Sequence, residues 1–99
     1  MQNSEDGATT RGTRPGQYTL VATFDGTQWA SLCRELDVAS FGTTAADALD
    51  RLAQAIHDAL DYERDTGVSA GDPVPEPAFT DFLESAHGAS PPVTKLLTV

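Results

Sequence analysis

Hydrophobic and polar side chains alternate over the first patterned part of the chain. Aromatic, aliphatic and small residues recur at every second position of Tyr18–Phe24, with Thr and Val between them. A period of two that is rich in β-branched and aromatic residues predicts a β-strand. Asp25-Gly26 follows, and this dipeptide favours a two-residue type I′ turn. We therefore predict a hairpin whose second strand covers Thr27–Cys33.

The two-residue turn also fixes which side chains share a face of the hairpin. The predicted cross-strand pairs are Tyr18 with Cys33, Leu20 with Ser31, Ala22 with Trp29 and Phe24 with Thr27. The face that we expect to form the core holds Tyr18, Leu20, Ala22, Phe24, Trp29 and Cys33. The opposite face is only half polar, because Val21, Ala30 and Leu32 lie on it among Thr and Gln.

A short apolar segment and a long helical pattern come next. Val38–Phe41 predicts a third antiparallel strand, which Gly42 ends. Thr44 is the predicted helix N-cap, and Asp47 completes an approximate capping box, with Asp in place of Glu or Gln. Over residues 45 to about 65, apolar residues recur every three to four positions instead of every second one. This predicts an amphipathic helix of roughly five to six turns at ~3.6 residues per turn.

The two faces of this helix differ in polarity. Its apolar stripe holds Ala45, Ala48, Leu49, Leu52, Ile56, Ala59 and Leu60. The opposite face holds Asp47, Asp50, Arg51, Gln54, His57, Asp58, Asp61 and Arg64. Gly67 is the expected stop, since glycine readily adopts the left-handed conformation that ends many helices.

Prolines at positions 73, 75 and 77 mark Val68–Pro77 as a linker, because proline fixes φ and has no N–H to donate. Ala78–Ala86 predicts a short second helix. Three of its residues, Phe79, Phe82 and Leu83, are spaced to cover one side of the core. His87–Pro92 predicts a turn region, and the weak alternation of Val93–Val99 predicts a final strand.

The order of these elements predicts an α+β fold, with a small antiparallel or mixed β-sheet (β-β-β-α-β) and one long helix packed on one face. Residues 1–16 hold no residue larger than Met1 that could be buried, so we expect a disordered N-terminal tail. A single domain is then predicted over residues 17–99.

Acidic residues outnumber basic ones, with 15 Asp and Glu against 6 Lys and Arg and a formal net charge of −9. Nucleic-acid binders and proteins on anionic membranes need cationic surfaces, so we expect neither direct nucleic-acid binding nor membrane docking. An acidic protein of this size fits a basic partner. The single cysteine, Cys33, suits a reducing compartment, and no segment resembles a signal peptide or a membrane span. We therefore expect a cytoplasmic protein.

Few residues suggest catalysis or metal binding. Asp25 and Asp47 fit turn chemistry and the first turn of a helix better than a two-metal site, which needs converging carboxylates. His57 lies on the polar helix face without a second ligand at zinc spacing, and His87 is distant in sequence. Cys33 fits a small buried group. We expect no catalytic residues, no metal and no cofactor.

Two groups of residues suggest an interface. If the long helix covers the core face, Val21, Ala30 and Leu32 are left as an apolar patch on an outer sheet face. We expect this patch to mediate homo-oligomerisation, with a basic partner as the second choice. The acidic residues Asp50, Asp58 and Asp61 form a solvated helix face, and they also fit an electrostatic landing surface for a basic partner.

The succession of elements resembles the HicB-like antitoxin family. Leu32–Ser40 is similar to that family's polar-acid-Leu-x-Val/Cys stretch, and Gly42–Leu49 (GTTAADAL) is similar to its G-[DE]-T-x-x-E-A-[LI] helix start. Asp72–Pro77 resembles the family's proline-containing exit from the helix, and Val93–Val99 resembles its closing strand. The chain departs from the family at Arg34–Val38, where Pro-Asp-x-Pro-Gly is common.

This resemblance implies a degenerate ribonuclease H-like fold that binds and neutralises HicA, a small basic ribonuclease. Many members carry a further DNA-binding domain, and we expect this chain to be a stand-alone form without one. Two alternatives stay open: a stand-alone HicB-like oligomer (a dimer or larger) of unknown role, and a degenerate ribonuclease H-like nuclease.

Overall fold

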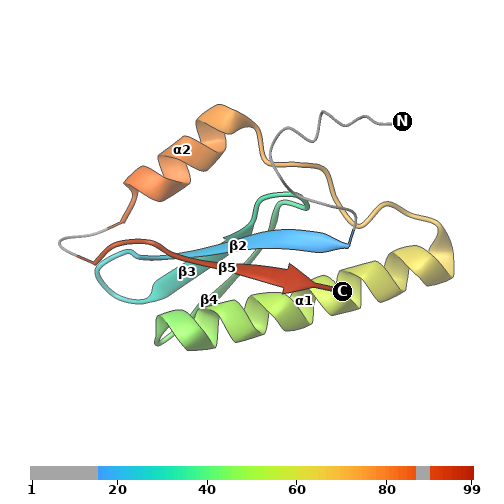
Figure 1. The fold of residues 1–99 in the computed structure, drawn as a ribbon, viewed down its shortest axis with the longest axis horizontal. Coiled ribbons are helices and arrows are strands. Elements are labelled where there is room, and N and C mark those ends of the chain that lie inside the picture. The colour runs from blue at the N-terminus through green and yellow to red at the C-terminus, as the bar shows by residue number, and fades with distance from the viewer. Residues whose placement is uncertain (1–15, 87–89) are drawn as a thin grey trace.

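A four-stranded antiparallel sheet forms the middle layer of the computed structural model, which describes residues 16–86 and 90–99 (Figure 1). Its strands are β2 (Gln17–Phe24), β3 (Trp29–Cys33), β4 (Val38–Gly42) and β5 (Val93–Thr98). They are ordered β4-β3-β2-β5, so β4 and β5 are the edges. The helix α1 (Ala45–Thr66) lies on one face, and α2 (Glu76–Glu84) lies on the other.

The α+β class and the long helix on one face are therefore confirmed, and the sheet is wholly antiparallel. The predicted tail falls outside the described residues except for Gly16, whose carbonyl accepts a hydrogen bond from the Val99 amide at 2.8 Å. The ribonuclease H-like relationship stays a prediction.

The predicted register of the hairpin is wrong by two residues. Phe24 pairs with Trp29, and the loop between them has four residues instead of two. The cause is the Asp25 side chain, whose Oδ1 accepts hydrogen bonds from the amides of Thr27 and Gln28 at 2.8 and 2.9 Å. This local bonding holds Thr27 out of the strand. Because the shift is an even number, every strand residue keeps its predicted face.

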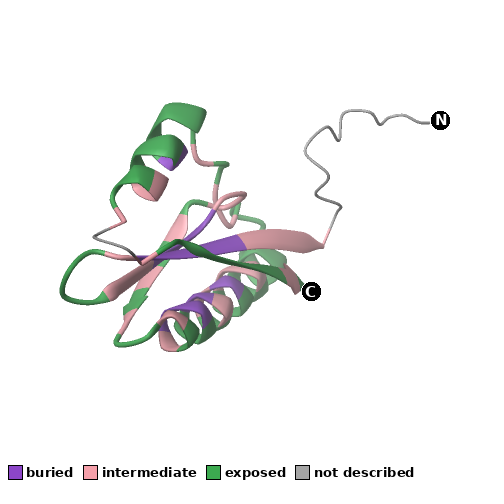
Figure 2. Ribbon diagram, turned by 60° about the vertical axis from the view of Figure 1, so that its left-hand side comes forward, coloured by how far each residue is buried: buried purple, intermediate pink, exposed green. Residues whose placement is uncertain are grey.

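α1 begins and ends where the sequence predicts. The Thr44 hydroxyl accepts the Asp47 amide hydrogen bond at 3.0 Å, and Gly67 adopts a left-handed φ of 77°. The buried side of α1 faces the sheet (Figure 2). Gly42 allows the first turn to approach β4, because a Cβ at this position would lie 2.4 Å from the Ala48 nitrogen.

The core between α1 and the sheet matches the predicted core face. Its fully buried members are Leu20, Ala22, Cys33, Ala48, Leu49, Leu52 and Ile56. Burial of these side chains is the main favourable contribution to folding. The Ser31 hydroxyl adds a buried hydrogen bond to the Ala48 carbonyl at 2.9 Å, which joins β3 to α1.

A second, smaller core lies on the other face of the sheet. Phe79 of α2 packs against Val21 and Leu32, and all three side chains are buried. Val74, Phe82 and Leu83 surround them. The chain therefore has three layers, with the sheet between two helices of very different length.

Candidate interaction surfaces

The apolar patch expected from the sequence is not exposed. Val21 and Leu32 retain only 2% and 8% of their accessible surface, and Ala30 is half-buried. The premise that this sheet face lacks a cover is wrong, because α2 places Phe79 on it. The long helix does cover the opposite face, but the short helix covers this one. An oligomer built on these residues would first require α2 to leave.

Arg34 anchors α2 in three ways. Its guanidinium forms an ion pair with Glu76 at 2.9 Å and lies 4.8 Å from the centre of the Phe79 ring. Its carbonyl accepts a hydrogen bond from the Val74 amide at 2.9 Å. The cation–π contact is worth about 0.5–1 kcal/mol at a partly exposed site. These contacts fix the end of the linker and the first turn of α2 on the sheet.

The acidic residues expected to meet a partner do lie on exposed surface. Asp50, Asp58 and Asp61 are exposed on α1, and Asp65 is exposed near its C-terminal end. Their spacing places them on the helix side opposite the buried residues, since each residue advances about 100° around the axis. With Asp47 they form a row, called the acidic stripe below (Asp47, Asp50, Asp58, Asp61 and Asp65). Because α1 rises about 1.5 Å per residue, the stripe is about 27 Å long.

Few cations neutralise the acidic stripe. Arg51 binds Asp47 at 3.1 Å and Arg64 binds Asp61 at 2.6 Å, and both pairs lie within α1. Among the described residues, Asp50, Asp58 and Asp65 have no ion pair. Such exposed pairs contribute little to stability. They neutralise Asp47 and Asp61 only, so the stripe as a whole stays negatively charged.

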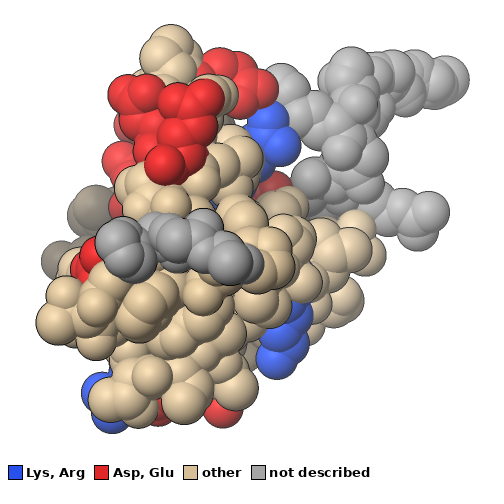
Figure 3. Space-filling view, turned by 90° about the vertical axis from the view of Figure 1, so that its left-hand side faces the viewer, with Lys and Arg blue, Asp and Glu red and all other residues tan. Residues whose placement is uncertain are grey.

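A second group of acidic side chains covers α2. Glu76, Asp81 and Glu84 are exposed there, and α2 contains no basic residue. Figure 3 shows the largest group of acidic side chains in this upper part of the molecule, whereas the rest of the same view is mainly uncharged, with a few basic and acidic side chains. Acidic surface therefore occurs on both outer helical layers.

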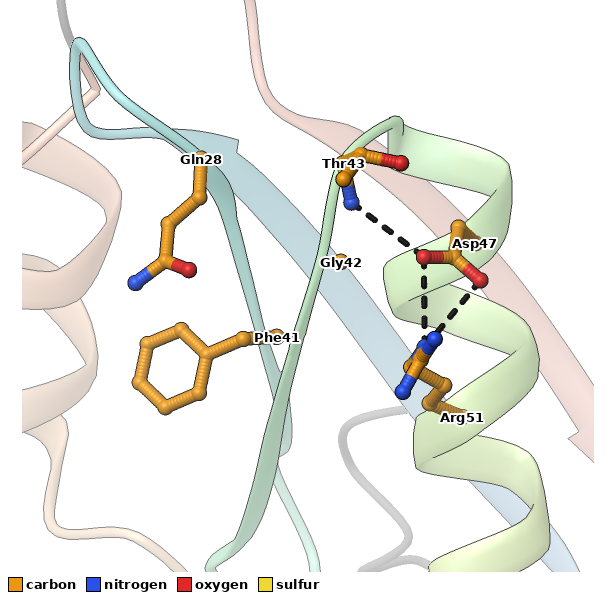
Figure 4. A pocket seen from close by; sticks show the side chains of 6 residues that line it. All are labelled: Gln28, Phe41, Gly42, Thr43, Asp47 and Arg51. Atoms are coloured by element: carbon orange, nitrogen blue, oxygen red, sulfur yellow. Dashed lines mark hydrogen bonds and ion pairs between the residues drawn. The ribbon is translucent and has the colours of Figure 1, made fainter.

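An open depression of about 270 Å³ lies where β4 meets the start of α1 (Figure 4). It is lined by Gln28, Phe41, Gly42, Thr43, Asp47 and Arg51. Phe41 is 52% exposed, which is unusual for a phenylalanine in a strand. The Thr43 amide and then the Arg51 side chain donate to Asp47 and hold the pKa of its carboxyl below the ordinary value.

The two carboxylates considered for a nuclease both have structural partners. Asp25 closes the hairpin loop, and the amides of Gln28 and Thr27 hold its pKa below the ordinary value. Asp47 bonds to the helix start and to Arg51. Within residues 16–86 and 90–99, no three His, Cys, Asp or Glu side chains gather as metal ligands would. Asp25 and Asp47 therefore have the turn and helix-start roles that the sequence predicts, and the nuclease alternative stays a prediction.

Cys33 is buried as expected, and desolvation raises the pKa of its thiol to about 11. A thiol with so little thiolate is a poor nucleophile. Its neighbour Glu35 has a role that the sequence did not reveal: the carboxylate accepts hydrogen bonds from the Thr19 amide and hydroxyl at 2.7 and 2.8 Å. His57 is exposed on α1, and His87 lies outside the described residues.

Comparison with known proteins yields no match to a family model, to a curated protein or to a solved structure. What the fold defines is an α+β domain with a helix on each face of an antiparallel sheet. Among the described residues, no helix is both long enough and apolar enough to cross a membrane.

Proposed function

We propose that this chain is a non-enzymatic interaction module of the HicB-like antitoxin type, which binds a small basic ribonuclease of the HicA type and blocks its active site. Support comes from the order of elements that resembles the family and from the formal net charge of −9. The acidic stripe is the observation that carries the proposal. It offers a basic partner an exposed surface on a rigid helix.

The charge distribution favours a partner that meets the folded domain. Residues 1–15 contain two acidic and two basic side chains, so the whole net charge of −9 falls on residues 16–99. Complementary charge accelerates association by steering the encounter, and its effect weakens as salt is added. Aspartate side chains are short, so their carboxylates stay close to the helix and lose little entropy when a partner binds.

The proposal is tested with three substitutions in the acidic stripe: Asp50→Asn, Asp58→Asn and Asp61→Asn. The matched control removes the same charge elsewhere, with Asp72→Asn, Asp81→Asn and Glu84→Gln. All six residues are exposed, so both variants should fold like the wild type. The tagged wild-type chain is used to recover a partner from its native lysate. The purified partner is then assayed for RNA cleavage with and without each form of the chain.

We expect a small basic ribonuclease that the wild type inhibits at equal molar ratio. The stripe variant should associate with it about tenfold more slowly at moderate salt, because three charges are removed from the steering surface. The control variant should lose less. The proposal is rejected if no basic protein is recovered in stoichiometric amount, if the recovered protein cleaves RNA equally well in the presence of the chain, or if both variants bind equally.

A further inference from the structure

Among the described residues, both edges of the sheet, β4 and β5, lack a further strand, and α1 packs mostly on β4. β5 pairs with β2 on one side only, whereas its other side is open. The Val99 amide donates to the Gly16 carbonyl, which identifies Gly16 and Val99 as a hydrogen-bonded pair. Because such pairs alternate in an antiparallel ladder, the backbone groups of Thr94, Leu96 and Thr98 point away from β2. These N–H and C=O groups can accept a further strand.

This edge also carries several exposed hydrophobic side chains. Leu96 is 59% exposed, and Val93 and Val99 are exposed large hydrophobic residues as well. Val93–Thr98 contains one charged residue, Lys95, and no proline. Natural edge strands are usually protected by charges, proline, bulges or a covering element. Here α1 packs chiefly on β4, β3 and β2, so it leaves the β5 edge open.

Charge indicates which partner fits this edge. No acidic residue occurs in residues 85–99, although the chain as a whole carries a net charge of −9. Two copies of so acidic a chain repel each other over most of their surface. Because residues 85–99 carry no acidic side chain, two copies can approach each other at the β5 edge without this repulsion between the two segments.

We propose that β5 pairs antiparallel with β5 of a second copy, around a twofold axis at Leu96. In this register Leu96 lies opposite Leu96 of the partner subunit, and Thr94 lies opposite Thr98 of the partner subunit. Both are pairs whose free backbone groups face outward, so each can exchange two N–H···O bonds. Val93 lies opposite Val99 of the partner subunit, so every exposed apolar side chain of the edge meets another.

Neighbouring registers fit less well. Centring the pair on Lys95 would place two lysines opposite each other, which is unfavourable. Centring it on Leu97 would place Leu96 opposite Thr98 of the partner subunit, so the exposed leucines would no longer meet. The twofold axis at Leu96 is perpendicular to the sheet, so the two sheets join into one and both α1 helices lie on the same face. This dimer leaves the acidic stripe accessible, so it does not depend on the proposed function.

The test compares one substitution at each edge of the sheet. Leu96→Lys places two like charges at the twofold axis, and Phe41→Lys makes the same kind of change on β4 at similar exposure. The mass of each form is measured by sedimentation equilibrium from low to high micromolar concentration. The wild type and Phe41→Lys should approach twice 10.5 kDa, whereas Leu96→Lys should stay near 10.5 kDa. Circular dichroism checks that both variants are folded.

A cross-linking experiment tests the register independently of stability. Leu96→Cys should oxidise to a covalent dimer, because opposite Cα atoms in such a pair lie about 5.5 Å apart, within the range of disulfides. Cys33 is buried and should not interfere. Phe41→Cys should give no covalent dimer at the same concentration. The proposal fails if the wild type is a monomer throughout, if Phe41→Lys dissociates it and Leu96→Lys does not, or if Phe41→Cys cross-links faster than Leu96→Cys.

Discussion

Removing either of two buried hydroxyl groups should change stability in opposite directions. Thr23 in β2 and Ser31 in β3 are both fully buried. The Ser31 hydroxyl donates to the Ala48 carbonyl, whereas the Thr23 Oγ1 atom has no hydrogen-bond partner among the residues that the structure describes. We predict that Thr23→Val stabilises the fold and that Ser31→Ala destabilises it.

The expected magnitudes follow from these environments. A buried hydroxyl without a partner costs about 1–3 kcal/mol of desolvation. Thr23→Val replaces that hydroxyl by a methyl group of similar shape, so the free energy of unfolding should rise by about 1 kcal/mol. Ser31→Ala loses a satisfied hydrogen bond and should lower it by about 1 kcal/mol. For a domain of this size, each kcal/mol shifts the midpoint of thermal unfolding by about 4–8 °C.

The measurement is urea unfolding followed by the fluorescence of Trp29, the single tryptophan, which packs 5.6 Å from the Phe24 ring. Thr23→Ser is the control, since it keeps the hydroxyl and removes a buried methyl group, and it should destabilise the fold. If Thr23→Val instead lowers the free energy of unfolding as much as Ser31→Ala does, the Thr23 hydroxyl has a partner and the reasoning is wrong.

Two further predictions concern the start of α1 and the effect of pH. Gly42→Ala should destabilise the fold by several kcal/mol, because the new Cβ would lie 2.4 Å from the Ala48 nitrogen. In the control Gly67→Ala the new Cβ meets only open space, so this substitution should cost about 1 kcal/mol for its positive φ. Equal losses of stability in thermal unfolding would contradict this prediction. The pKa values of the Asp25 and Asp47 carboxyls are lower in the folded state than the ordinary 3.8. Their ionised forms therefore add to the free energy of unfolding above that pH, and this contribution is lost as the pH falls through the folded-state pKa values. Unfolding measured across the acidic range should show stability falling below about pH 4, and less steeply in Asp47→Asn; an unchanged slope in that variant would count against the assignment.

Much of the fold could be predicted because local signals agreed with one another. The Thr44 cap, the apolar period of α1 and the stop at Gly67 all describe the same helix, and each lies within the helix's own sequence. Alternation likewise assigned strand residues to the correct faces. The hairpin register was not predicted, because Asp25-Gly26 fits a two-residue turn and only the bonds of the Asp25 side chain select the longer loop.

The acidic stripe could be predicted in part, since Asp50, Asp58 and Asp61 follow from helical spacing alone. The role of Glu35 could not. Its carboxylate reaches the Thr19 amide across 16 positions of sequence, at a point where β2 continues beyond the end of β3. Such a contact depends on which strand ends first, and no local pattern records that.

Val21 and Leu32 were expected to be exposed, but α2 buries them. A hairpin that is apolar on both faces indicates a sheet covered on both sides. The chain has two amphipathic helices, and the apolar side of α1 covers the sheet face that holds Leu20, Ala22 and Cys33. Phe79 of α2 is then left to pack on the opposite face, where it contacts Val21 and Leu32. Once both faces are covered, a dimer through a sheet face would require one helix to leave. The open edge of β5, with its polar backbone groups and exposed apolar side chains, is therefore where we propose that a second copy adds.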